Sequence, residues 1–321
     1  MKNHKTLIIK TGYSEILEGR NNSRTVSLGD VLRTTPLLVL YPKDSITWVT
    51  DLAAFPLLEG NTRIHKVLPY DFTTSLQLTA EEFDRVINLE KIPGICALAD
   101  RIRARRSRYG FTFNSQSGEA EAFDKAYEVL AVSCDPQAKK QNKRPSQELL
   151  FEMVGAKWNG ERYSLGYQPS GIEQYDVALN TQVGEKWPSK AWPLLNWDVL
   201  EEVLVKQGYR VTRQDELKGG KRVNRFNTLP AYMDWLYSSR LLVSNDSLGL
   251  HLGLAMDKKV LGLFGPTPSS EVHFYGQGEA ILPTIDCAHH PCFREKCLID
   301  HNCMETINPE QVLDKIREYT S

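Results

Sequence analysis

The alternation of strand, loop and helix in this chain is plainest in residues 241–251, which read LLVSNDSLGLH. Three apolar residues suited to a buried strand precede four small polar residues, and a mainly apolar segment resumes at Leu248. A short apolar run, a polar turn and a helix-like segment together form one half of a βα unit. The stretch therefore predicts a parallel α/β sheet, with residues 244–247 in a loop at the carboxyl end of a strand.

The same alternation extends to both sides of this stretch and falls into two series. The predicted strands are residues 7–9, 46–49, 66–68 and 85–89 in the first half, and 175–180, 209–211, 241–243 and 260–264 in the second. Helices are predicted at 147–153, 197–206, 229–237 and 249–256. We expect two Rossmann-like α/β domains, residues 1–168 and 169–321, whose parallel sheets face a central cleft with ligands at the carboxyl ends of the strands.

Composition narrows the class of protein. The chain has 321 residues, 41% of them hydrophobic and 25% charged, with a formal net charge of -1. These values are typical of a soluble globular protein without a dominant charge, so nucleic acid is not expected as a main partner. The apolar run before Lys10 has three residues, too few for a signal peptide or a transmembrane segment. The sequence thus predicts a cytoplasmic protein.

A candidate catalytic carboxylate stands in the first half. Residues 27–36 read SLGDVLRTTP, in which Ser27, Gly29 and Asp30 come just before a helical stretch that contains Arg33. Ser followed by Asp at a helix start also fits a simple N-cap, with the acid favoured by the helix dipole. The chemical interpretation of Asp30 therefore depends on the second half.

Three strand-end loops of the second half are rich in groups that bind anions. They are residues 180–190 (NTQVGEKWPSK), 244–251 (SNDSLGLH) and 265–268 (GPTP). Main-chain N–H groups at a helix start, hydroxyls and ammonium groups together suit a diphosphate. The candidate nucleotide-sugar-binding residues are Thr181, Lys186, Lys190, Asp246, Ser247, Leu248, Gly249, His251 and Thr267.

The ordered motifs resemble those of the heptosyltransferase-type glycosyltransferases of glycosyltransferase family 9, which include lipopolysaccharide heptosyltransferases. The motifs are SLGDVLRTTPLL at 27–38, KWPSKAWP at 186–193, SNDSLGLH at 244–251 and LFGPT at 263–267. FPLLEGN at 55–61 and RRSRYGF at 105–111 extend the resemblance over nearly the whole chain.

This resemblance implies a GT-B fold and an inverting transfer of heptose from a nucleotide sugar, usually ADP-heptose, to an acceptor hydroxyl. It implies that Asp30 is the catalytic base, that Ser27, Gly29 and Arg33 lie on the acceptor side, and that catalysis needs no cofactor or divalent metal. Protein donors would then stabilise the leaving diphosphate. The candidates are Thr181, Lys186 or Lys190, Ser247 and the N–H groups of residues 248–250.

The chain departs from the family pattern at three places. Residues 11–26 form an insertion between the first strand and Ser27. Leu248 stands where a glycine usually follows Asp-Ser, and Gly249 comes one place later. Lys186 and Lys190 are equal candidates for the phosphate-loop lysine. The acceptor also stays open between lipopolysaccharide core, another glycan, a protein side chain and a small natural product.

Four cysteines near the C-terminus form a C-x4-C-x4-C-x5-C series: Cys287, Cys292, Cys297 and Cys303. Four thiolates can hold a structural zinc or iron ion, and His289, His290 or His301 could replace one of them. Free thiols and disulfides are the alternatives. A catalytic role for a metal here is not expected, because the series belongs to the C-terminal tail rather than to a strand-end loop.

The basic stretch RIRARRSR at 101–108 has two interpretations. It could bind an anionic acceptor or a membrane surface. Any contact with a membrane is expected to be peripheral. It could equally be a solvated helix end before a strand at 109–113.

Two other functions compete with sugar transfer. One is a nucleotide-sugar-binding protein that acts in assembly or regulation without catalysis, and the other is an enzyme that epimerises or hydrolyses the nucleotide sugar. Dinucleotide, P-loop and serine-hydrolase motifs do not occur at the strand ends.

Overall fold

The structure is a computed structural model, and it describes residues 4–13, 26–285, 287–297 and 302–320. The chain folds into two compact units, Met1–Gln168 and Pro169–Ser321. Within the described ranges no helix is both long and apolar enough to cross a membrane.

Unit 1 is built on a six-stranded sheet with the order β3-β2-β1-β4-β5-β6. The strands are β1 (Lys5–Ile9), β2 (Ser45–Thr50), β3 (Lys66–Pro69), β4 (Glu82–Asn88), β5 (Arg103–Phe113) and β6 (Ala120–Ala122), of which only β6 pairs antiparallel. The helices are α1 (Leu28–Thr34), η1 (Thr35–Leu40), η2 (Leu52–Ala54), α2 (Phe55–Leu58), α3 (Phe72–Ala80), α4 (Pro93–Arg101), η3 (Asp124–Ala126), α5 (Tyr127–Cys134), α6 (Pro136–Gln141) and α7 (Ser146–Met153).

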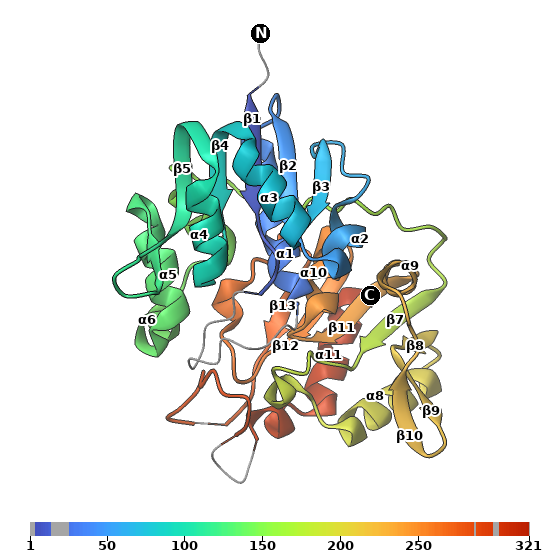
Figure 1. The fold of residues 1–321 in the computed structure, drawn as a ribbon. Helices are drawn as coiled ribbons and strands as arrows, with labels where there is room; N and C mark the ends of the chain where they lie inside the picture. The colour runs from blue at the N-terminus through green and yellow to red at the C-terminus, as the bar shows by residue number, and fades with distance from the viewer. Residues whose placement is uncertain (1–3, 14–25, 286, 298–301, 321) are drawn as a thin grey trace. The chain divides into compact units, whose positions relative to one another are not determined.

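Apolar strand residues give unit 1 its core. Leu7 and Ile9 of β1 pack with Val49, Val86 and buried residues of α3 and α4, and both helices lie along one face of the sheet (Figure 1). Alternate residues of a strand point to opposite faces, so Ile8, which is also buried, serves the other face. A parallel sheet covered on both faces needs such uninterrupted apolar strands.

Unit 2 has a five-stranded parallel sheet with the order β13-β12-β11-β7-β8 and a separate β9-β10 hairpin. The strands are β7 (Tyr175–Asn180), β8 (Val211–Arg213), β9 (Asp215–Lys218), β10 (Lys221–Asn224), β11 (Ser239–Asn245), β12 (Lys259–Leu263) and β13 (Gly278–Ile281). The helices are η4 (Pro188–Lys190), α8 (Leu194–Lys206), α9 (Leu229–Tyr237), α10 (Leu248–Ala255), η5 (Ser269–Glu271), η6 (Cys303–Thr306) and α11 (Pro309–Thr320).

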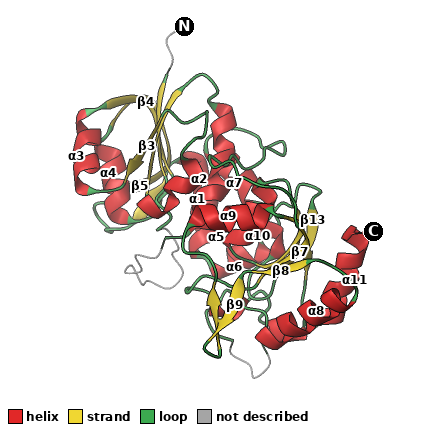
Figure 2. Cartoon of the chain, turned by 90° about the vertical axis from the view of Figure 1, so that its right-hand side faces the viewer, coloured by secondary structure: helices red, strands yellow, loops and turns green. Residues whose placement is uncertain are grey.

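Helices cover both faces of this second sheet. Helices α8 and α11 lie side by side (Figure 2) and bury their apolar residues against Leu241 and Val243 of β11. Gly253 of α10 approaches Leu242, which points to the opposite face of the same strand. The predicted parallel α/β architecture is therefore confirmed in each unit.

Each sheet reverses its winding direction once. In unit 1 the chain adds β2 and β3 on one side of β1 and then returns to place β4 on the other side. In unit 2 it adds β8 beside β7 and then places β11 on the opposite side of β7. At such a switch point the connections leave the two neighbouring strands in opposite directions, which leaves room for a ligand at their carboxyl ends.

The basic stretch at 101–108 differs from the expected helix end. Helix α4 ends at Arg101, and strand β5 already begins at Arg103 instead of Tyr109. Arg105 pairs with Glu82 and Arg106 with Asp84, both on the adjacent strand β4. Cross-strand pairing with carboxylates makes extended backbone compatible with this run of arginines.

Candidate active site

Asp30 lies in the first turn of α1, near the carboxyl end of β1. The backbone of Ser27 has the extended conformation of an N-cap residue, but its side chain does not bond a helix N–H group. Its hydroxyl instead forms a hydrogen bond with the carboxylate of Asp30. Ser27 therefore occupies the N-cap position without capping the helix through its side chain. Its hydroxyl helps to hold Asp30, whose side chain is 26% exposed.

Positive charges surround the Asp30 carboxylate. Burial by itself would raise the pKa of Asp30, but Lys10, Arg33, the bond from Ser27 and Lys91 together outweigh it and lower this pKa to about 2. The Arg33 Nη1 atom lies 3.6 Å from Asp30 Oδ1, one helical turn away. Asp30 is thus ionised across the physiological pH range and can accept a proton.

The insertion at residues 11–26 leaves Ser27 close to the strand it follows. Most of this segment, residues 14–25, lies outside the described part of the chain. At its base the Ser27 N–H donates to the Gly12 carbonyl at 2.8 Å, so the chain comes back to the point where it left. Gly12 has a φ of 90°, and a Cβ there would lie 2.9 Å from the Ser27 carbonyl oxygen, so this close return favours glycine.

A buried carboxylate fixes the loop that follows β1. Glu90 is fully buried and accepts the N–H groups of Thr11 and Gly12 at 2.7 and 2.8 Å, while Lys10 Nζ lies 3.3 Å from the same oxygen. Lys10 therefore interacts with two carboxylates: it lies beside Glu90, and its charge lowers the pKa of Asp30. Glu90 connects the ends of β1 and β4, the two strands at the switch point.

Lys91 completes the charged group at this strand end. Burial, followed by repulsion from Lys10, lowers the pKa of Lys91 to about 8 despite the opposing effects of Glu90 and Asp30. The sequence motifs did not identify Lys10, Glu90 or Lys91 as site residues. Their signal was a charged residue directly after a buried strand, a position where charge is unexpected unless it serves a site.

Asn180 links the two central strands of unit 2. Its side-chain amide donates to Ser244 Oγ at 2.7 Å and to Ser247 Oγ at 3.0 Å, and its oxygen accepts the Tyr232 hydroxyl at 2.6 Å. Ser247 stands at the N-cap of α10 without bonding a helix N–H group through its side chain. The hub at Asn180 therefore fixes where α10 begins.

The one-place shift of glycine in this motif has a steric reason. Gly249 lies on Asn180, and a Cβ at this position would be 2.4 Å from both Asn180 Nδ2 and Tyr232 Oη. Leu248 starts the helix and needs no such close approach. The departure from the family pattern thus leaves a glycine at the point of closest contact.

Asp246 gathers three of the predicted donor-site residues. Lys190 Nζ and Thr267 Oγ1 each bond its Oδ2 atom at 2.7 Å. Burial opposes ionisation of Asp246, but Lys190, then His251 and Thr267, outweigh it and hold its pKa far below the usual range. The structure therefore brings Lys190, rather than Lys186, to Asp246, where the loops after β7, β11 and β12 meet.

Thr181 and His251 have more restricted surroundings than the motif suggested. The Thr181 hydroxyl donates to Asp215, so its proton is engaged within the protein. His251 lies one turn into α10 with 5% of its surface exposed. Asn245, which the motifs did not identify as a site residue, donates from its side-chain amide to the Thr181 carbonyl at 2.7 Å and orients the end of β7.

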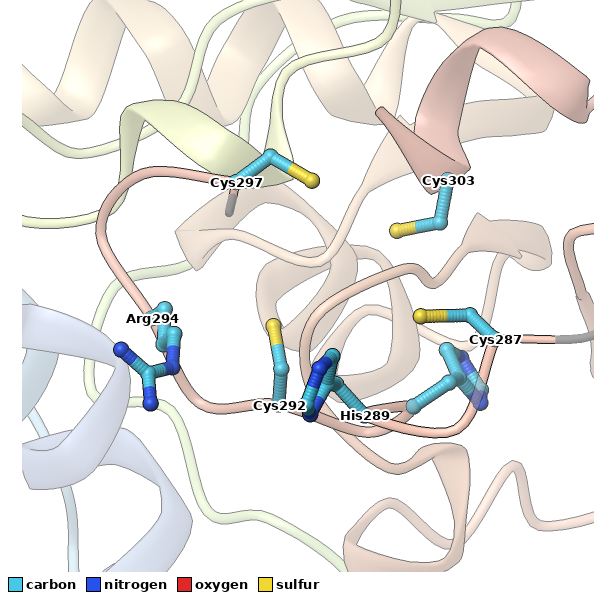
Figure 3. Close-up of a pocket in the computed structure, with 7 residues that line it drawn as sticks. Cys287, His289, Cys292, Arg294, Cys297 and Cys303 are labelled. Carbon is cyan, nitrogen blue, oxygen red and sulfur yellow. The ribbon is translucent and has the colours of Figure 1, made fainter. Parts of the chain in front are cut away.

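The four cysteines of the C-terminal series line one cavity, together with His289, His290 and Arg294 (Figure 3). All four are free thiols, and their sulfur atoms point toward the space between them. Burial and the nearby Cys292 and Cys297 raise the pKa of Cys303 to about 11. In the described ranges no group of three or more His, Cys, Asp or Glu side chains is already arranged as a metal site. His301 lies outside the described residues.

Part of the amino-acid sequence is similar to known heptosyltransferases. Residues 226–302 match the model of glycosyltransferase family 9 (heptosyltransferase). Lipooligosaccharide heptosyltransferase 2 of Campylobacter jejuni subsp. jejuni serotype O:6 (strain 81116 / NCTC 11828) is 25% identical over 122 residues. That match spans 38% of this chain and 38% of the relative.

The fold of this chain matches that of solved structures over nearly its whole length. The E. coli ADP-heptose lps heptosyltransferase II has a TM-score of 0.66 at 15% identity, covering 98% of both chains. The dodecameric iron-containing heptosyltransferase TibC of enterotoxigenic E. coli H10407, in complex with ADP-D-beta-D-heptose, has a TM-score of 0.60 at 13% identity, covering 100% of this chain and 78% of TibC. The chain therefore has the GT-B fold of these heptosyltransferases.

Proposed function

We propose that this chain, which resembles the heptosyltransferases of glycosyltransferase family 9, is an inverting glycosyltransferase that moves heptose from ADP-heptose to an acceptor hydroxyl. Asp30 is the general base in this proposal. The observation that carries it is an ionised carboxylate held by Ser27, Lys10 and Arg33 at the switch point of unit 1. A protein that only bound nucleotide sugar would not need such a carboxylate.

In the proposed reaction, the acceptor oxygen attacks the anomeric carbon as its proton passes to Asp30. The new C–O bond forms while the bond from the anomeric carbon to the diphosphate oxygen breaks, and ADP leaves with the bonding electron pair. A carboxylate with a pKa of about 2 is a weak base, so the proton moves late, when the attacking oxygen has become strongly acidic.

The leaving diphosphate gains negative charge in the transition state and is proposed to be stabilised by unit 2. Lys190 has three ammonium N–H donors, one of which is hydrogen-bonded to Asp246. The N-terminus of α10 adds main-chain N–H groups. Fixed donors of this kind stabilise developing charge without a catalytic metal ion. We therefore propose that transfer itself requires no cofactor.

The donor and the setting are part of the same proposal. Solved relatives of the same fold are ADP-heptose enzymes, and the curated relative acts on lipooligosaccharide. A glycan of the lipopolysaccharide class is accordingly the first acceptor to test, ahead of proteins and small molecules. We propose a cytoplasmic location, with at most peripheral contact with a membrane.

An Asp30→Asn variant tests the catalytic role. Asparagine has the same shape but is no base, so transfer from ADP-heptose should fall about 10²- to 10⁴-fold. The dissociation constant for ADP should stay unchanged, because the proposed nucleotide contacts belong to unit 2. Glu59→Gln, which removes an exposed carboxylate from unit 1, is the matched control.

The outcomes separate the competing functions. Unchanged transfer by Asp30→Asn would remove Asp30 from the mechanism. Native protein that binds ADP but yields no product with any acceptor would favour the non-catalytic binding protein. ADP, or an isomerised nucleotide sugar, formed at the same rate without acceptor would favour hydrolysis or epimerisation.

A further inference from the structure

The segment formed by residues 287–297, here termed the cysteine loop, contacts two of the donor-site loops from outside the site. The Phe293 N–H donates to the Pro266 carbonyl at 2.9 Å, and Pro266 directly precedes Thr267. Ser189 Oγ donates to the Arg294 carbonyl at 2.5 Å, and Ser189 directly precedes Lys190. The cysteine loop is therefore hydrogen-bonded to the residues that directly precede Thr267 and Lys190, the two side chains that bond Asp246.

Cys303, the fourth cysteine, packs against the same region. A Cβ at Gly265 would lie 2.9 Å from Cys303 Sγ and 2.4 Å from Met304 Sδ. This absence of space shows that the start of η6 lies directly against the loop that carries Thr267. Cys303 thus borders both the cavity that it shares with the cysteine loop and the loop that carries Thr267.

The four thiols suit a metal that prefers sulfur. Cys287, Cys292, Cys297 and Cys303 line one cavity, and zinc and iron both accept four thiolates in a tetrahedral arrangement. Because these side chains are not yet arranged as a metal site, binding would draw the sulfur atoms together and release their protons.

We propose that one zinc or iron ion bound by Cys287, Cys292, Cys297 and Cys303 makes the cysteine loop a positioning element of the donor site. The bound ion fixes Phe293 and Arg294, which in turn hold Thr267 and Lys190 at Asp246. The role in donor binding rests on the proposed function, whereas the constraint on the two loops does not.

The experiment compares the purified chain with the same chain stripped of metal by a thiol reagent and chelator, then reloaded with Zn²⁺ or Fe²⁺. We expect about one ion per chain by elemental analysis. Stripping should speed amide hydrogen exchange at 187–192 and 263–268, and should weaken ADP binding about tenfold, as for loss of one charge-assisted hydrogen bond. Reloading should reverse both changes, and the ion that does so identifies the metal.

Two variants test the connection without removing a thiol. Ser189→Ala deletes the hydroxyl bonded to Arg294, so it should keep the metal and weaken ADP binding. Gly265→Ala should lower metal content and ADP affinity together, because its methyl group would displace both Met304 and Cys303. Gly94→Ala, in unit 1 and away from the donor-site loops, is the matched control, since a Cβ there meets nothing within 4 Å. Cys134→Ser, an exposed thiol of unit 1, should keep full metal content.

The proposal fails if the chain takes up no metal, or if stripping leaves both the hydrogen exchange and the ADP dissociation constant unchanged in folded protein. Loaded protein that binds no ADP would contradict the proposed donor instead. In that case the exchange rates at 187–192 and 263–268 still decide whether the ion positions the two loops.

Discussion

Replacing Gly249 by alanine should destabilise unit 2, although alanine is the better helix former. In an open helix position this change stabilises by about 1 kcal/mol. Here the added Cβ would lie 2.4 Å from Asn180 Nδ2 and from Tyr232 Oη. Both side chains are buried and hydrogen-bonded: Tyr232 Oη donates to Asn180 Oδ1, and Asn180 Nδ2 donates to Ser244 Oγ and Ser247 Oγ. Neither atom can therefore rotate into free space.

The magnitude follows from the distance that must open. Ordinary van der Waals contact begins at 3.4 Å, so the start of α10 must move by about 1 Å or the Asn180 hydrogen bonds must break. Overpacking of this kind costs about 1–3 kcal/mol, and a lost buried hydrogen bond adds about 1 kcal/mol. After subtracting the gain in helix propensity, a net loss of about 2 kcal/mol is expected, or a melting temperature lower by roughly 4–8 °C.

Scanning calorimetry of Gly249→Ala measures this loss, and ADP titration should show weaker binding because the N-terminus of α10 has shifted. Gly94→Ala is the control: Gly94 is also helical, but a Cβ there meets nothing within 4 Å. That variant should leave stability unchanged or raise it by up to about 1 kcal/mol. Equal or higher stability of Gly249→Ala would refute the close-contact argument.

Two further predictions concern lysines. Lys190→Met should weaken ADP binding about 10- to 100-fold through loss of a charged donor, and it should do so more than Lys186→Met. Calorimetric titration of both variants with ADP measures the difference, and the opposite ranking would assign the role to Lys186. The pKa of Lys91 in the folded chain is about 8, below the ordinary lysine value of 10.5. Between these pH values the unfolded chain therefore holds a proton that the folded chain lacks. The contribution of Lys91 to the free energy of unfolding therefore rises with pH across that window. Lys91→Met should abolish this rise, which urea unfolding measures from pH 7.5 to 9.5. An identical pH slope in the variant and the native protein would contradict the prediction.

Much of the fold could be predicted from local patterns. Helix α9 has the predicted bounds, and β7 spans the predicted residues 175–180. Apolar runs bounded by polar turns define such elements because burial selects apolar side chains at a fixed period. The start of β5 was wrong by six residues, since its arginines are compatible with a strand only through carboxylates supplied by β4.

The candidate site divides in the same way. Motifs predicted which loops carry polar donors, and they named Asp30, Lys190 and Thr267. They did not find Glu90, which acts on Thr11 and Gly12 from 79 and 78 positions away along the chain. Nor did they separate Lys186 from Lys190, because the distinction is a contact with Asp246 across 56 positions.

The sequence by itself determined two α/β halves and the strand-end loops, and it predicts that three of those loops bind anions. These follow from side-chain period and from the order of residues around each turn, which are local properties. Only the tertiary structure decided which side chains meet: Lys190 with Asp246, Asn180 with Ser247, and Ser27 with Asp30 beside Lys10. The physical reason is that charge, burial and hydrogen bonding depend on distance in space. Parallel strands bring the ends of distant segments to one edge of a sheet.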